Sequence, residues 1–139
     1  MTGKVFVDTN VLIYAHDADA GPKRRKSAAL LKELWENRSG CLSTQVLQEF
    51  YVNTTQKIKA PLSKSAAREV IRTYVSWAES PNTPATVLRA SEISETWQIS
   101  FWDGMIVAAA EQSQATRLCT EDLAHGSTIA GVKVVNPFL

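Results

Sequence analysis

Short apolar runs alternate along this chain with longer segments in which apolar residues recur at helical spacing. The first run, residues 5–7, is β-branched and aromatic, which is typical of a buried strand. Short strands that alternate with helices favour a parallel sheet, because each crossover places a helix on one of its faces. We therefore expect an α/β fold, a three-layer α/β/α sandwich around a central, mainly parallel sheet of about four to five short strands.

The same patterns predict where the elements lie. Expected strands are residues 5–7, a run beginning at 41–42, a brief strand at 86–88, and residues 117–120 and 132–135. Expected helices are residues 10–16, 24–37, 44–57, 63–78, a segment running from 89 to about 97, and a central helix, apolar on every face, around 105–110. We interpret the turn-rich residues 80–84 as a helix-to-strand loop.

The length and composition favour one hydrophobic core. With 139 residues and 45% hydrophobic content, the chain is expected to form a single domain over residues 1–139. No run approaches the roughly 20 apolar residues of a membrane span, and the start lacks the apolar core of a signal peptide, so we expect a cytosolic protein. Cys41 and Cys119 lack zinc-ligand spacing and are expected to be buried, reduced thiols.

The net charge of +1 neither indicates nor excludes a nucleic-acid partner. The densest basic cluster could contact phosphates, or it could simply be the solvated start of a helix. It consists of Lys23, Arg24, Arg25 and Lys26. Trp102 could stack on an RNA base, or it could belong to the core or to an interface.

Four acidic residues are placed where they could meet. Asp8 follows the first strand directly, and Asp122 lies two residues beyond the strand at 117–120. Both would project from the carboxyl edge of a parallel sheet, where the chemistry of such folds gathers. Asp103 opens the central apolar helix, and Glu49 lies one turn into the helix that follows the strand at 41–42. We predict that all four carboxylates converge at this edge.

Each of these acids also has a structural interpretation. Asp8 could cap the following helix, Asp103 could form a capping box with Ser100, Asp122 could cap a final turn, and Glu49 could be solvated. Carboxylates held together, however, raise one another's pKa unless a cation neutralises them. Mg²⁺ and Mn²⁺ prefer oxygen ligands and would activate a water for in-line attack at phosphorus. The cluster therefore indicates metal-dependent phosphodiester chemistry.

Four segments together resemble the PIN-domain family, and specifically the VapC-type toxins of toxin-antitoxin pairs. Residues 5–12 resemble the opening strand and first acid of the family, and residues 43–50 resemble its second-acid helix. Residues 101–110 resemble the helix that begins with the third acid, and residues 118–123 resemble the last acidic turn. The order and spacing of these segments extend from residue 4 to the end of the chain.

This resemblance implies RNA cleavage that depends on Mg²⁺ or Mn²⁺, together with a homodimer and a small antitoxin protein as partner. The implied metal ligands are Asp8, Glu49, Asp103 and Asp122, supported by Thr9, Asn10 and Thr120. Either Glu121 or Asp122 could face the metal, and the motif spacing favours Asp122. Gly104 departs from the Ala expected after the third acid, and we expect little effect because a helix start tolerates Gly.

Other functions are weighed against this one. A haloacid-dehalogenase-like phosphatase also begins with an apolar strand ending in Asp, but it needs a second carboxylate where this chain has Asn10. Two further alternatives keep the PIN fold. One is a nuclease of RNA processing that has no antitoxin, and the other is a catalytically inactive domain that binds nucleic acid.

Overall fold

The computed structural model describes residues 3–139, so Met1 and Thr2 of the expected domain lie outside the described residues. The strands are β1 (Lys4–Val7), β2 (Gly40–Cys41), β3 (Ala115–Cys119), β4 (Thr128–Ile129) and β5 (Val132–Val135). They form one sheet in the order β2-β1-β3-β5-β4. All neighbouring strands are parallel except β4 and β5. The predicted α/β fold with a mainly parallel sheet is confirmed.

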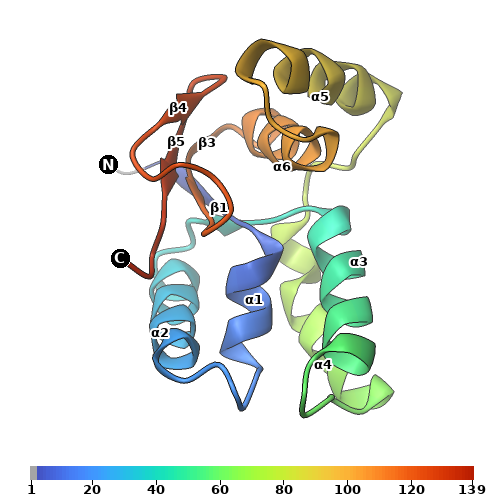
Figure 1. Ribbon diagram of the computed structural model, residues 1–139. Coiled ribbons are helices and arrows are strands. Elements are labelled where there is room, and N and C mark those ends of the chain that lie inside the picture. Colours follow the sequence, from blue (N-terminus) through green and yellow to red (C-terminus); the bar gives the residue numbers. More distant parts are fainter. Residues whose placement is uncertain (1–2) are drawn as a thin grey trace.

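The helices lie in two groups about this sheet. They are α1 (Thr9–Ala15), α2 (Pro22–Glu36), α3 (Thr44–Val52), α4 (Lys64–Tyr74), α5 (Pro84–Trp97) and α6 (Phe101–Gln112). In Figure 1, α5 and α6 lie together to the upper right of the strands, and α1 to α4 lie below them. A π-helical turn (Asn53–Lys57) extends α3, and a 3-10 turn (Val75–Trp77) extends α4.

The prediction of a strand at residues 86–88 is wrong, because these residues belong to the first turns of α5. Thr83 caps this helix: its side chain and that of Thr86 bond reciprocally to the two backbones in a capping box. Pro84 occupies the first turn, where its fixed φ favours a helix and its missing N–H removes no hydrogen bond. These end signals outweigh the β-preference of Val87.

Two smaller differences separate the structure from the sequence pattern. Strand β4 was not predicted, since two residues carry no periodicity; it pairs antiparallel with β5 across a tight turn in which Ala130 and Gly131 both have positive φ. The helix predicted over residues 44–57 leaves α-helical geometry after Val52. There Thr54 and Thr55 donate side-chain hydrogen bonds to carbonyl oxygens four residues earlier.

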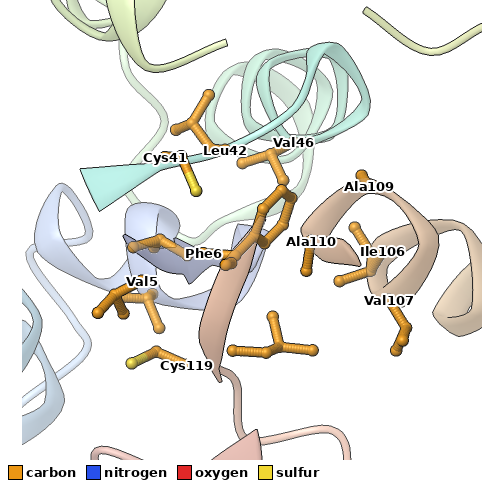
Figure 2. Close-up of a cluster of buried hydrophobic side chains, with 14 of the residues drawn as sticks. Val5, Phe6, Cys41, Leu42, Val46, Ile106, Val107, Ala109, Ala110 and Cys119 are labelled. Atoms are coloured by element: carbon orange, nitrogen blue, oxygen red, sulfur yellow. The ribbon is translucent and has the colours of Figure 1, made fainter. Parts of the chain in front are cut away.

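The core lies on both faces of the central strands. Phe6 points to one face of β1, and Val5 and Val7 point to the other, yet all three are at most 1% exposed. Figure 2 shows side chains of β1, β2, α3, α6 and β3 meeting in this cluster. The buried, unpaired Cys41 and Cys119 belong to it, as predicted, and burial raises the pKa of both thiols to about 11. Among residues 3–139, no helix is both long and apolar enough to cross a membrane.

Candidate active site

Asp8 sits at the junction of β1 and α1, at the carboxyl edge of the sheet. It is the N-cap of α1, and one carboxylate oxygen accepts a hydrogen bond of 2.7 Å from the Thr9 backbone N–H. The other oxygen accepts from the Thr120 hydroxyl at 2.8 Å. The side chain of Asp8 therefore fills the structural role weighed above, and it is also held rigidly at the site.

The charge of Asp8 is unfavourable in this position. The residue is only 5% exposed, and burial, together with the nearby carboxylates of Asp122 and Glu49, raises its pKa to about 6. The hydrogen bonds from Thr120 and Thr9 oppose this shift without cancelling it. An acid buried beside two other acids is a common feature of functional sites and is stabilised by a cation.

Asp122 reaches the same edge from the neighbouring strand. Val7 at the end of β1 lies beside Cys119 at the end of β3, so the turns after the two strands are adjacent. Asn10 connects them, donating from Nδ2 to Asp122 Oδ2 at 3.1 Å and to the Thr120 hydroxyl at 3.2 Å. Burial and the charges of Asp103 and Glu121 raise the pKa of Asp122, and the hydrogen bond from Asn10 opposes this.

Glu49 and Asp103 come to the site on helices. The Thr9 hydroxyl donates to Glu49 Oε1 at 2.6 Å, which ties α3 to the start of α1. Ser100 caps α6 by accepting from the Asp103 backbone N–H at 3.0 Å, and this fixes Asp103 in the first helical turn. Only the Ser100 half of the capping box anticipated from the sequence is seen in the described residues, because the Asp103 side chain lines the pocket with the other acids.

One pocket of about 190 Å³ brings these side chains together. It is lined by Asp8, Thr9, Asn10, Ile13, Gln45, Glu49, Asn53, Trp102, Asp103, Ile106 and Asp122. All four acids singled out in the sequence therefore line one site, and Thr120 lies behind it, fully buried. Ile13, Gln45, Asn53 and Ile106 were not singled out. For the two polar residues, the signal in the sequence was their spacing of four from Glu49, which places Gln45, Glu49 and Asn53 on one face of a helix.

Glu121 and Asp122 point to different surroundings. Glu121 pairs with Lys23 Nζ at 2.8 Å and accepts a hydrogen bond from the Tyr14 hydroxyl, whereas Asp122 lines the pocket. Burial alone would raise the pKa of Glu121, but the hydrogen bonds from Lys23 and Tyr14 and the charge of Lys23 hold it below its ordinary value. The geometry therefore favours Asp122 over Glu121 at the site.

Removing the Tyr14 hydroxyl should weaken the fold in a pH-dependent way. Because the pKa of Glu121 is lowered in the folded state, its contribution to stability is present at neutral pH and is lost as pH falls through that lowered pKa. We expect Tyr14→Phe to reduce the free energy of unfolding by about 1 kcal/mol at pH 7 and by less at pH 3.5. Urea denaturation at both pH values checks this, with Tyr51→Phe on α3 as control. An equal loss at both values would contradict the role of Glu121.

The residues suggested for substrate contact divide into two groups. Trp102 is 65% exposed and stands at the pocket. The basic cluster at the start of α2 does not line it: Lys23 is paired with Glu121, whereas Arg24, Arg25 and Lys26 are exposed. Of the residues suggested for substrate contact, only Trp102 therefore lines the pocket with the four acids.

The pocket offers oxygen donors of the kind that a divalent cation requires. Within residues 3–139, no group of three or more His, Cys, Asp and Glu side chains is arranged to hold a metal ion by itself. Mg²⁺ retains several waters and typically binds through one or two carboxylates plus substrate phosphate. Asp8 and Asp122, linked through Thr120 and Asn10, supply hard oxygen donors of this kind. The residues present therefore fit such an ion.

The fold and this pocket define a class of α/β domains with an acidic site at the carboxyl edge of a parallel sheet. The family model of the PIN domain matches residues 5–127. The chain belongs to the PIN domain family, and the resemblance identified from its sequence is confirmed.

Solved structures of similar fold come from toxin-antitoxin systems. A toxin-antitoxin complex from Klebsiella pneumoniae matches with a TM-score of 0.67 and 20% identity over 96% of this chain and 98% of that one. VapBC2 from Rickettsia felis, bound to a DNA fragment from its promoter, matches with a TM-score of 0.64 and 18% identity over 94% and 96% of the two chains.

A third structure is VapC20 from Mycobacterium tuberculosis, described as a sarcin-ricin loop cleaving toxin. Its TM-score is 0.59, with 18% identity over 83% of this chain and 87% of that one. At these identities the likeness concerns the fold. None of the curated proteins compared with the chain matches it.

Proposed function

We propose that this protein is a metal-dependent endoribonuclease that cleaves RNA phosphodiester bonds with Mg²⁺ or Mn²⁺. The observation that carries the proposal is the convergence of four carboxylates in one pocket, with the pKa of buried Asp8 raised to about 6. A fold that holds such a cluster without an ion carries an electrostatic cost, which a divalent cation would relieve.

The residues of the pocket have distinct roles in this proposal. Asp8, Asp103, Asp122 and Glu49 would hold the ion, some of them directly and the others through the waters that Mg²⁺ retains. The ion, when bound, supplies charge neutralisation and an activated water. Thr120 orients Asp8, Asn10 orients Asp122, and Thr9 orients Glu49 through the hydrogen bonds described above. Supporting contacts of this kind fix the direction of the ligand oxygens.

RNA is proposed as the substrate for reasons of fold and surface. A neighbour of the same fold is described as cleaving the sarcin-ricin loop. Trp102, exposed beside the acids, offers a face on which an unpaired base can stack. The basic residues Lys23 to Lys26 are proposed only as a more distant contact for the phosphate backbone, outside the pocket.

We further propose that the protein is the toxin of a toxin-antitoxin pair. Neighbours from Klebsiella pneumoniae and Rickettsia felis are found in complexes of toxin and antitoxin. The proposed partners are a cognate antitoxin protein and a second copy of this chain. A cytosolic location stays a prediction.

The proposal is tested by following cleavage of a mixed RNA pool in Mg²⁺, in Mn²⁺ and in EDTA. We expect cleavage in either metal, none in EDTA, and none with Asp103→Asn. Asp19→Asn serves as the matched control, since Asp19 is an exposed acid in the loop after α1. Intact RNA under every condition, with both proteins folded and Mn²⁺ bound, would indicate a binding domain instead. Cleavage that persists in EDTA would overturn the metal-dependent mechanism.

A further inference from the structure

Gln45 has a buried amide that no group of the protein satisfies. The residue lies in the first turn of α3, is 8% exposed and lines the acidic pocket. Within residues 3–139, neither its Nε2 nor its Oε1 has a hydrogen-bond partner. Buried polar side chains in folded proteins nearly always have partners, so this amide requires an explanation.

Packing alone does not explain a glutamine at this position. The neighbouring buried positions of α3 include Val46 and Phe50, which are apolar and fully buried. An apolar side chain of the same volume at position 45 would bury no unsatisfied group and would keep the helix propensity. The amide is therefore better explained by a ligand than by the fold.

The position of Gln45 connects it with the proposed cleavage site. Gln45, Glu49 and Asn53 all line the pocket, and successive members are four residues apart. Gln45 therefore lies one helical turn, about 6 Å along the axis, from Glu49. A group bound at Gln45 would belong to the nucleotide whose phosphate is held at the carboxylates, or to an adjacent one.

The hydrogen-bonding capacity of the amide narrows the ligand. Glutamine presents both donors and an acceptor. A metal ion would use only Oε1, and a phosphate oxygen would use only Nε2, so each would leave half of the amide unsatisfied. A hydroxyl group donates and accepts, so it can satisfy both halves of the amide. Both amide atoms are almost inaccessible to solvent in the free protein, so the Gln45 side chain must turn toward the pocket to meet it. The ribose 2′-hydroxyl, which distinguishes RNA from DNA, has this chemistry.

We propose that Gln45 binds a ribose 2′-hydroxyl next to the scissile phosphate and thereby selects RNA. This inference rests on the proposed ribonuclease function and adds a specificity-determining residue to it. The residue takes no part in bond cleavage, and its contribution is to the binding and placement of the RNA strand.

A double-substitution cycle between protein and RNA tests this proposal. The cleavage site of a short RNA is mapped first, and oligonucleotides are then made with a single 2′-deoxyribose at each flanking position. For wild type, we expect one such replacement to lower kcat/KM about ten-fold. Gln45→Met, which keeps size and helix propensity, should lower kcat/KM for all-ribose RNA to a similar degree and show no further loss at that position.

Thermal unfolding separates binding from a structural role. Gln45→Met should leave Tm unchanged or raise it by a few degrees, because it removes an unsatisfied buried amide. Gln48→Met, at an exposed position of the same helix, is the matched control. It should alter neither Tm nor the loss of kcat/KM that a single 2′-deoxyribose causes. A Gln45→Met protein with a lower Tm, which still loses as much kcat/KM as wild type when a 2′-deoxyribose is introduced, would overturn the proposal. So would a wild-type enzyme that tolerates every replacement, whereas a wild type that leaves all-ribose RNA intact would refute the ribonuclease function itself.

Discussion

Asp8→Asn should lower RNA cleavage at least about a hundred-fold and, at the same time, stabilise the metal-free protein. Cleavage falls because a neutral amide is a poor ligand for Mg²⁺ or Mn²⁺. Stability rises because the substitution removes a buried charge beside Glu49 and Asp122 while keeping a side chain that caps α1 well. Loss of activity combined with a gain in stability is the signature of a residue retained for function.

The gain in stability has a defined pH dependence. The pKa of Asp8 is raised to about 6 in the folded state, so the folded protein binds this proton more tightly than the unfolded chain does. The free energy of unfolding of wild type therefore falls as pH rises from about 4 to about 6. Asp8→Asn should be more stable by as much as about 3 kcal/mol at pH 7, and the difference should vanish below about pH 4.

Urea denaturation in EDTA, at pH 4 and pH 7, measures this difference, and the RNA assay measures the loss of activity. Asp19→Asn, which removes an exposed acid, should change neither quantity. Added Mn²⁺ should reduce the stability difference, because it binds the folded wild type and compensates the buried charge. An Asp8→Asn protein that is less stable than wild type at pH 7, or that still cleaves RNA, would contradict this account of the residue.

Gly104→Ala is expected to destabilise the protein by about 2 kcal/mol, although alanine is the better helix former. A Cβ at this position would lie 2.6 Å from the carbonyl oxygen of Ala90 and 3.4 Å from the Cβ of Ser94, both on α5. A backbone oxygen cannot move aside as a flexible side chain can. The added methyl group must therefore push α6 and α5 apart, and it sits next to Asp103.

Thermal or urea unfolding of Gly104→Ala measures this effect. The sign of the change in the free energy of unfolding decides between two expectations. Helix propensity alone predicts a gain of about 1 kcal/mol, whereas the close approach of α5 predicts a loss. We also expect lower RNA cleavage, since a shift in the first turn of α6 moves the Asp103 carboxylate. A variant as stable and as active as wild type would show that the two helices separate freely at this point. Helix propensity at this position gives no reason to prefer Gly over Ala, and only the close approach of α5 does.

Much of the fold was predictable because its signals are local. The runs at 5–7 and 132–135 are short and β-rich, and the helices begin at side chains that cap them, such as Ser43, Ser63 and Ser100. The errors arose where local signals were weak or conflicted. Val87 favours a strand but stands in a capped helix, and β4 is too short to show any alternation.

By itself, the sequence determined the parallel α/β architecture. It also predicted that four acids converge, because strand ends in such a sheet share one edge. Only the tertiary structure decided which groups meet there. It directs Glu121 toward Lys23 and Tyr14 and leaves Asp122 to the pocket, a choice between adjacent residues that spacing cannot make. It also buries the Gln45 amide without a partner and brings α5 against Gly104. These features depend on contacts between segments distant in the chain, which no local pattern of residues records.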